Sequence, residues 1–331
     1  MTNTAPAPKK RAVTPKKSID IIIPAYNEED CVEELANRLG ALFDKEKAYT
    51  WRAIIVENGS KDRTWELLKN VSAADPRITV LRLSRNFGMD GGLTAGLAFA
   101  TADATVFMTA DLQDPPEAIS SFIVEWEKGA DNVYGLVTER QGSSLMRRLN
   151  SRAFYAVANS LTKGRLTKNA SDFRLMDRRL YEALRDLNER NRFMRGLVAW
   201  AGFESVGVPV ARPPRFGGKS KAYSWTVIDL ALRAIFAHSY VPIRAISVLG
   251  FLSAFGAIVA FIVMAIIWFT AGVPFPGFGT IVTLVLLVFG ALTLILGVIA
   301  EYVALIYEEV KGRPNFVVWD TIGLVKPGRS S

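Results

Sequence analysis

The stretch Thr105-Val-Phe-Met-Thr-Ala-Asp-Leu-Gln-Asp-Pro-Pro116 decides the fold of this chain. A short apolar run ends in two acids, Asp111 and Asp114, and then in two prolines. This pattern predicts a buried strand that stops at a turn with carboxylates at its carboxyl end, where open α/β sheets bind their ligands. Carboxylates there suit a divalent cation, which in turn suits a phosphorylated substrate. Asp and Pro are also ordinary residues of a solvated turn, so the stretch alone leaves both interpretations open.

Strand and helix patterns alternate on both sides of this stretch, which predicts a mostly parallel sheet covered by helices. The predicted strands are Ser18–Ile23, Trp51–Glu57, Ile78–Leu83, Ala104–Thr109 and Asn132–Val137. The predicted helices are Glu28–Lys45, Arg63–Val71, Asp90–Ala100 and Glu117–Lys128. Asn27 is expected to cap the first of these helices. The chain has no glycine fingerprint for a dinucleotide after the first strand and no Walker-type phosphate loop.

The C-terminal part of the chain is strongly apolar. From Ala245 through Ala300 there is no acidic, basic or histidine residue. A membrane-spanning helix needs about 20 apolar residues, so we predict two transmembrane helices, residues 242–270 and 277–306. A buried helical hairpin of a soluble core is the alternative, but both segments are apolar on every face. Basic residues flank the pair on both sides, which predicts that both termini and the soluble part lie in the cytoplasm.

The rest of the chain divides by composition. Residues 1–17 carry five Lys or Arg, three Pro and no acid, which predicts a disordered basic arm. Residues 18–215 hold the α/β domain. Residues 216–241 combine a cationic loop with an amphipathic helix, which we expect at the membrane interface or on the soluble domain. Residues 307–331 are predicted to be a cytoplasmic tail.

Single residues exclude several kinds of chemistry. Cys31 is the only cysteine, so no disulfide forms within the chain. His238 is the only histidine and lies beside the predicted membrane boundary. A mechanism based on histidine and a zinc site built from histidines are therefore not expected. The net charge is +8, but no nucleic-acid partner is expected.

Polar motifs follow the predicted strands in order. They are Pro24-Ala-Tyr-Asn-Glu-Glu29, Val56-Glu-Asn-Gly-Ser-Lys-Asp-Arg-Thr64, Leu83-Ser-Arg-Asn-Phe-Gly88, Ala110-Asp-Leu-Gln-Asp-Pro-Pro116, Arg192-Phe-Met-Arg195 and Arg215-Phe-Gly-Gly-Lys-Ser-Lys221. Together with the apolar hairpin, this set resembles the family-2 glycosyltransferases of the GT-A fold. The resemblance is greatest to the polyprenyl-phosphate group, which contains the bactoprenol glucosyltransferases and dolichyl-phosphate mannose synthases.

The resemblance implies a Rossmann-like nucleotide-sugar domain and a set of site residues. The residues implied to bind the donor nucleotide are Pro24, Tyr26, Glu28, Glu57, Asn58, Ala110 and Asp111. The donor phosphates and sugar are assigned to Asp114, Arg215, Lys219 and Lys221. Arg152 and Arg174 are implied to hold the acceptor phosphate, and they count with Asp111 as the catalytic residues. Asp111 and Gln113 are implied to bind Mg²⁺ or Mn²⁺.

Two positions depart from the family pattern. Glu57-Asn58 replaces the usual Asp-Asp, which leaves the preferred nucleotide open between uridine, our first choice, and others. Thr109 replaces the first acid of the usual Asp-x-Asp motif. Since Mg²⁺ often uses only one or two carboxylates, we expect weaker metal binding without donor rather than inactivity.

The implied reaction is an inverting transfer of a hexose, glucose first, from a UDP-sugar to a polyprenyl phosphate in the inner membrane. Mannose, galactose, an N-acetylhexosamine and an aminoarabinose derivative remain alternative sugars. The two membrane helices would gain packing by self-association, so a homo-oligomer is expected. Two other functions stay open: a processive polysaccharide synthase, which usually has more spans, and a catalytically inactive membrane scaffold that binds sugar nucleotides.

Overall fold

The computed structural model describes residues 16–137, 170–190, 192–213 and 277–324, with scattered positions between 248 and 270. Several predictions fall outside these residues. They concern Arg152, Arg215, Lys219, Lys221, the interfacial helix, nearly all of the basic arm and most of the first membrane span.

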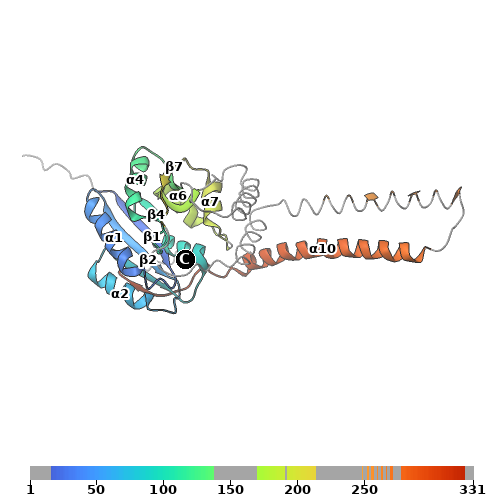
Figure 1. The fold of residues 1–331 in the computed structure, drawn as a ribbon, viewed down its shortest axis with the longest axis horizontal. Helices are drawn as coiled ribbons and strands as arrows, with labels where there is room; N and C mark the ends of the chain where they lie inside the picture. Colours follow the sequence, from blue (N-terminus) through green and yellow to red (C-terminus); the bar gives the residue numbers. More distant parts are fainter. Residues whose placement is uncertain are drawn as a thin grey trace, which may run out of the picture.

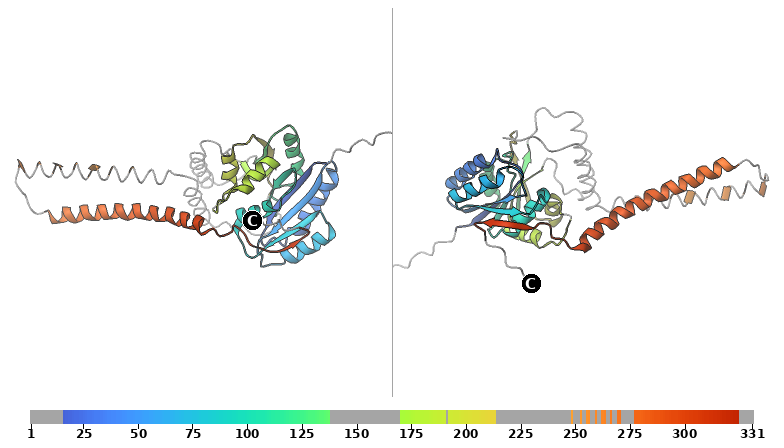
Figure 2. Two further views of the ribbon diagram at one scale, coloured as in Figure 1. Left: turned by 180° about the vertical axis from the view of Figure 1, so that it is seen from behind. Right: turned by 90° about the horizontal axis from the view of Figure 1, so that it is seen from below.

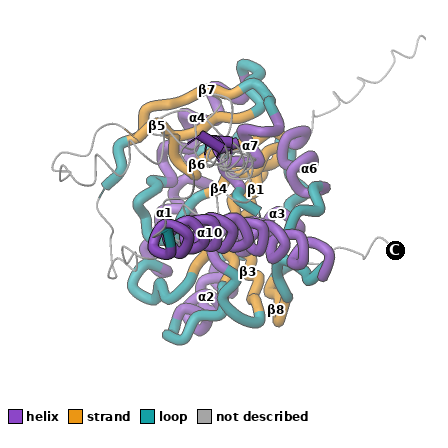
Figure 3. The backbone as a smooth tube through the Cα atoms, turned by 90° about the vertical axis from the view of Figure 1, so that its right-hand side faces the viewer, coloured by secondary structure: helices purple, strands orange, loops and turns teal. Residues whose placement is uncertain are grey.

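The centre of the molecule is an eight-stranded sheet with the order β7-β5-β6-β4-β1-β2-β3-β8. Figure 3 shows β7 at the upper edge of this sheet and β3 and β8 at the lower edge. The strands are β1 Ser18–Ala25, β2 Thr50–Glu57, β3 Ile78–Leu83, β4 Ala104–Phe107, β5 Asn132–Val137, β6 Ala170–Asp177, β7 Ser205–Val210 and β8 Val318–Ile322. The five strands predicted from the sequence are all present, with bounds shifted by at most two residues.

The sheet is mixed rather than mostly parallel. Strands β4, β1, β2 and β3 are parallel neighbours, but β6 runs antiparallel to both β4 and β5. Strand β6 was not predicted from the sequence, because Asp172, Arg174 and Asp177 interrupt its apolar pattern. Strand β8 was also missed: it lies in the predicted tail and pairs antiparallel with β3.

Helices cover both faces of the sheet (Figure 1). The helices are α1 Val32–Lys45, α2 Thr64–Ala74, α3 Gly88–Ala98, α4 Ile119–Glu127, α6 Arg178–Asp186, α7 Met194–Ala201 and α10 Phe278–Lys311, with a 3₁₀ turn at Pro116–Ala118. Helices α1, α2 and α4 share one apolar core with one face of the sheet. Helices α3, α6 and α7 share a second core with the other face.

The side chains of β1 show how one strand supplies both cores. Ile21 and Ile23 point into the first core and Ile22 into the second, because successive side chains of a strand point to opposite faces. Helix α3 lies very close to this strand. A Cβ atom on Gly96 would come 2.3 Å from the Cγ2 atom of Ile22, so a glycine is required there. This close approach fixes the position of α3, whose amino end borders the site described below.

Helix α10 projects away from the domain (Figures 1 and 2). It has 34 residues. Its segment Val288–Lys311 has a mean hydropathy of 2.2 and no buried part, so by length and composition it can cross a membrane. It is the one such helix found in the described residues, so the predicted pair of spans remains a prediction.

The carboxyl end of α10 is attached to the domain at several points. The backbone N–H of Arg190 donates to Glu309 Oε1 at 2.8 Å, and Asn315 Nδ2 donates to the carbonyl of Glu189 at 3.0 Å. Strand β8 then joins the sheet directly after this attachment. The apolar helix is therefore held at a defined place on the domain.

Candidate active site

The carboxyl ends of β4, β1 and β2 lie side by side, because these strands are parallel neighbours. Ala25 at the end of β1 pairs with Glu57 at the end of β2. The loops that follow these two strands are joined: the backbone N–H of Asn27 donates to Ser60 Oγ at 3.0 Å, and Lys61 N–H donates to Asn27 Oδ1 at 2.8 Å. The structure thus brings together the strand ends that the sequence predicted to form the site.

The expected helix cap at Asn27 is wrong. Asn27 has a left-handed backbone with φ of 52°, and α1 begins only at Val32, with Cys31 in the capping position. A short polar side chain such as asparagine tolerates this conformation because it can hydrogen-bond locally. Here the side chain accepts from the neighbouring loop, so Asn27 shapes the site rather than the helix.

Glu57 and Asn58 hold loops together inside the protein. Glu57 is fully buried, and its carboxylate accepts hydrogen bonds from the Ser60 N–H and from Arg82 Nε. The amide of Asn58 accepts from the Phe87 N–H at 2.9 Å and donates to the Gly88 carbonyl at 2.8 Å. These contacts fix the loops after β2 and β3. They engage the same polar groups that the sequence analysis assigned to the nucleotide.

The hydroxyl of Thr109 connects the two predicted acids. Thr109 Oγ1 lies 2.7 Å from Asp111 Oδ1 and 2.9 Å from Asp114 Oδ2. The Gln113 N–H donates to Asp111 Oδ1, and the Thr109 N–H donates to Asp114 Oδ2, both at 3.2 Å. Both carboxylates are buried, with exposures of 5% for Asp111 and 3% for Asp114. The position that departs from the family pattern therefore orients both remaining acids.

The turn between the two acids has a special backbone. Leu112 has φ of 58°, which is uncommon for a residue other than glycine. Such conformations concentrate at functional sites, where the surrounding structure holds them. Burial raises the pKa of Asp114, although Arg212, at 3.5 Å, and Thr109 act against this.

The remaining donor residues surround the same strand ends. Pro24 and Ala110 are buried, while Tyr26, Glu28 and Gln113 are half-buried. The described residues contain no group of three acids, cysteines or histidines that could hold a metal ion. The donor set at this place is the Asp111 carboxylate and the Gln113 amide. This set fits a cation such as Mg²⁺, which takes one or two protein carboxylates and completes its shell with substrate phosphates and water.

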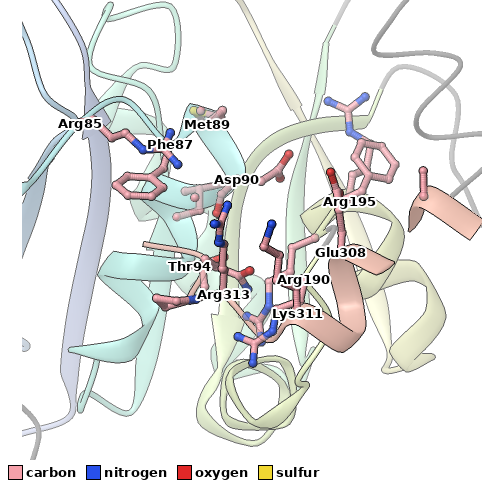
Figure 4. A pocket seen from close by; sticks show the side chains of 18 of the residues that line it. Arg85, Phe87, Met89, Asp90, Thr94, Arg190, Arg195, Glu308, Lys311 and Arg313 are labelled. Atoms are coloured by element: carbon pink, nitrogen blue, oxygen red, sulfur yellow. The ribbon is translucent and has the colours of Figure 1, made fainter. Parts of the chain in front are cut away.

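A cavity of about 850 Å³ lies between α3, the segment before α7 and the foot of α10 (Figure 4). Its walls carry the apolar residues Phe87, Leu93, Phe193, Ala304 and Tyr307. Six basic and three acidic side chains also line it: Arg85, Arg190, Arg192, Arg195, Lys311, Arg313, Asp90, Asp172 and Glu308. This cavity was not predicted from the sequence. One part of its lining that the sequence had singled out is the basic motif Arg192-Phe-Met-Arg195.

Asp172 and Arg195 form a two-pronged ion pair in the wall of the cavity. Arg195 Nε and Nη2 donate to the two carboxylate oxygens at 2.9 and 2.6 Å. Burial acts to raise the pKa of Asp172, but the charge and hydrogen bonds of Arg195, with a contribution from Arg174, lower it below its ordinary value. Asp172 is therefore an ionised carboxylate with a fixed orientation at the cavity.

Arg174 lies behind this pair and does not line the cavity. It is 5% exposed. Its guanidinium donates to the carbonyl of Ser171 at 3.0 Å and to that of Asp172 at 3.4 Å. Burial lowers the pKa of Arg174 to about 10. Of the two arginines predicted for the acceptor phosphate, the structure places this one in the interior of the domain, and Arg152 is outside the described residues.

Asp90 connects the amino end of α3 with the start of α7. Its Oδ1 accepts from the N–H of Met194, the first residue of α7, at 3.0 Å. Burial raises the pKa of Asp90 to about 6, and the nearby charge of Asp172 adds to this increase. Arg195 acts in the opposite direction without cancelling it.

We expect Asp90→Asn to stabilise the fold near neutral pH. Since the folded-state pKa of about 6 exceeds the ordinary value of 3.8, the folded protein holds its proton more tightly. Its stability therefore falls as pH rises through that window. Asparagine keeps the acceptor for Met194 and removes the buried charge, for a gain of about 1–3 kcal/mol at pH 7.

Unfolding midpoints of both proteins at pH 4 and pH 7 measure this effect. The midpoint of the variant should fall less than that of the parent between the two values. An equal fall in both proteins would contradict the assigned shift.

Comparisons with known proteins agree with this architecture. The glycosyl transferase family 2 model matches residues 20–185. An uncharacterized glycosyltransferase of Synechocystis is 38% identical over 92% of this chain and 96% of its own length. A prophage-derived bactoprenol glucosyl transferase of Shigella flexneri is 32% identical over 91% of this chain and 97% of its own length.

One solved structure, glucosyl-3-phosphoglycerate synthase of Mycobacterium tuberculosis, is 17% identical over 66% of this chain and 78% of that chain, with a TM-score of 0.47. A likeness this weak adds nothing to the sequence matches. The resemblance noted from the strand-end motifs is confirmed by the family match and by relatives that align over nearly the whole chain. The chain belongs to glycosyltransferase family 2 and is a glycosyltransferase.

Proposed function

We propose that this enzyme transfers a hexose, most readily glucose, from a UDP-sugar to the phosphate of a membrane polyprenyl phosphate. The observation that carries the proposal is the place of α10. An exposed apolar helix ends in the wall of a charged cavity on the glycosyltransferase domain. A substrate with a phosphate head and an apolar tail would find both environments there. The similarity to bactoprenol glucosyl transferases supports the same acceptor.

The donor is assigned to the ends of β1, β2 and β4. Pro24, Tyr26, Glu28 and Ala110 would surround the base and ribose, and Glu57 and Asn58 would position the loops around them. Asp111 and Gln113 would hold Mg²⁺ or Mn²⁺ against the diphosphate, and such a cation neutralises the charge of a departing diphosphate. Asp114, together with Arg215, Lys219 and Lys221, would complete the phosphate and sugar subsite.

The acceptor brings its own nucleophile. A phosphate monoester carries a charge of about −1.5 to −2 at pH 7, so it needs no strong general base. One of its oxygens forms a bond to C1 of the sugar, and the bond from C1 to the diphosphate oxygen breaks, with both electrons leaving on UDP. A single displacement inverts the anomeric centre. Arg152 and Arg174 are proposed to hold the acceptor phosphate during this step, because arginine grips phosphate oxygens in pairs. Arg174 would exchange its contacts with the carbonyls of Ser171 and Asp172 for the phosphate oxygens.

The membrane arrangement follows from the same proposal. Residues 242–270 and 277–306 would span the inner membrane as a hairpin, with the catalytic domain and both termini in the cytoplasm. Residues 216–241 would lie at the interface. Since two isolated spans would gain packing by association, a homo-oligomer is expected.

A transfer assay tests the proposed function. Membranes with the full chain and polyprenyl phosphate are supplied with radiolabelled UDP-glucose, other UDP-sugars or GDP-mannose, with Mg²⁺ or Mn²⁺. The expected result is label in the lipid fraction, strongest with UDP-glucose. If the lipid fraction is labelled only from another sugar nucleotide, that compound is the donor in place of UDP-glucose. Donor binding without transfer under every condition would favour the sugar-nucleotide scaffold, and long polysaccharide products would favour the processive synthase.

A further inference from the structure

Three basic side chains meet at the foot of α10: Arg190, Lys311 and Arg313, together named the basic cluster. All three line the cavity. The guanidinium of Arg190 reaches to 4.0 Å from where a Cβ of Gly312 would lie, between the other two members of the cluster. Figure 4 shows the three side chains in the same part of the cavity, beside the end of α10. Arg190 comes from a part of the chain more than 100 residues before Lys311 and Arg313.

The charges of the basic cluster are not neutralised by ion pairs with described acidic groups. The other cavity cations are engaged: Arg195 binds Asp172, Arg192 donates to backbone carbonyls of residues 185, 187 and 189, and Arg85 stacks on Phe87. Lys311 lies 5.0 Å from the ring centre of Tyr307. A lysine in the last turn of a helix is ordinary, but the two arginines belong to other segments. Glu308 also lines the cavity and Glu309 accepts from the Arg190 N–H, so the three cations outnumber the carboxylates beside them. An excess of positive charge favours an anionic ligand.

The walls beside the cluster are apolar. Ala304 and Tyr307 lie on the same face of α10 as Lys311, two turns and one turn before it, and all three line the cavity. Phe193 and Leu93 line the cavity from the domain side. A ligand that fits here has an anionic group and an apolar part next to it. A nucleoside diphosphate presents a planar base there instead of an aliphatic chain.

The basic cluster also lies at a suitable depth for a lipid. If the second span ends at Ile306, Lys311 follows five residues later, about 8 Å further along a helix that rises ~1.5 Å per residue. The headgroup layer is roughly 5–8 Å thick on each side of the bilayer. Basic pockets next to membrane helices on the cytoplasmic side are typical sites for lipid phosphates.

We infer that the basic cluster is a capture site for the phosphate of the polyprenyl-phosphate acceptor, with the first isoprene units against Ala304 and Tyr307. The inference rests on the proposed function and adds a binding site to it. The site is distinct from Arg174, which does not line the cavity. From the basic cluster the cavity continues to Asp90, Asp172 and Arg195. The lipid phosphate would thus be bound at the membrane surface before it meets the donor.

Alanine variants of the full chain in neutral-lipid nanodiscs test the capture site. We expect Arg190→Ala, Lys311→Ala and Arg313→Ala each to raise the KM for polyprenyl phosphate about tenfold, and the triple variant about a hundredfold or more. The KM for the UDP-sugar should stay unchanged. The bond from the Arg190 backbone to Glu309 survives these changes, so the attachment of α10 is kept. Lys311→Arg keeps the positive charge, so its KM for polyprenyl phosphate should stay close to that of the parent.

Lys128→Ala is the matched control, since Lys128 directly follows α4 and its side chain is 65% exposed. Its acceptor KM should equal that of the parent. Retention of radiolabelled polyprenyl phosphate, phosphatidylglycerol and UDP by parent and triple variant identifies the ligand without turnover. Loss of polyprenyl phosphate alone supports the inference. Equal loss of phosphatidylglycerol would make the basic cluster a general headgroup site, and loss of UDP would assign it to the donor; either overturns the inference.

The activity of the parent protein distinguishes failure of the proposed function from failure of the capture site. If the parent transfers no sugar to polyprenyl phosphate, the proposed function fails. If the parent transfers sugar and the triple variant has the same acceptor KM, the proposed function stands and the capture site is wrong.

Discussion

Asp111→Asn is expected to lower turnover by about three orders of magnitude or more while the protein stays folded. Asparagine has the same shape, and its oxygen can accept the hydrogen bonds now donated by Thr109 and Gln113. The substitution removes the negative charge proposed to hold the divalent cation. Cation assistance to a departing diphosphate is worth several kcal/mol, and each 1.36 kcal/mol is about tenfold in rate.

The measurement is the steady-state rate of lipid glycosylation over a range of Mg²⁺ concentrations. Asp75→Asn is the control, because that carboxylate is also hydrogen-bonded, by Arg77, but precedes β3 at the opposite end of the sheet. The control should keep the parent rate. Parent-like turnover in Asp111→Asn, or a lower rate with an unchanged Mg²⁺ requirement, would remove Asp111 from the metal site.

Thr109→Val is expected to lower turnover by about 10–100-fold. Valine matches threonine in shape but lacks the hydroxyl that contacts both Asp111 and Asp114. Loss of a hydrogen bond to a buried charged group costs about 1.5–3 kcal/mol of free energy. Here the loss would also let the two carboxylates turn away from their present orientation. Both acids would remain, so the effect isolates their orientation from their charge.

Thr109→Ser keeps the hydroxyl and serves as the matched comparison. We expect its rate within about threefold of the parent, since the remaining hydrogen bonds are unchanged. Equal rates for the valine and serine variants would show that the hydroxyl has no part in the reaction. The interpretation of Thr109 as a replacement for the usual acid would then be wrong.

The strands of the sheet could be predicted because they are buried on both faces. Runs such as Ile21-Ile-Ile23 in β1 have no polar side, as is typical of parallel strands covered by helices. Strand β6 could not be predicted, because its charged residues obscure the pattern and its position depends on contacts with β4 and β5. Strand β8 follows a membrane-type helix and has no buried residue of its own.

Part of the candidate site could be predicted from the sequence because turn residues follow strand ends. The convergence of the ends of β1, β2 and β4 follows from the parallel order alone. The partners of each side chain do not. Arg82, the partner of Glu57, is 25 residues away. The Thr109 hydroxyl looked like a loss in the sequence, whereas the structure shows it between two acids.

The cavity could not be predicted because its residues are distant in the sequence. Asp90 meets Met194 across 104 residues, and Arg190 meets Glu309 across 119. The local periodicity of a sequence gives no information on contacts between such distant residues. The sequence identified the basic motif at Arg192–Arg195 but not the groups facing it, and it left residues 307–331 as a tail although they supply Lys311 and Arg313.

Transfer from radiolabelled UDP-glucose, with and without excess chelator, tests the central claim most directly. The claim is that a cation at Asp111 assists the departure of the diphosphate while a lipid phosphate attacks from the membrane side. The account predicts label in polyprenyl phosphate that disappears with chelator, returns with Mg²⁺ or Mn²⁺, and is absent when a water-soluble alcohol replaces the lipid. Undiminished transfer in chelator, or equal transfer to the soluble alcohol, would contradict it.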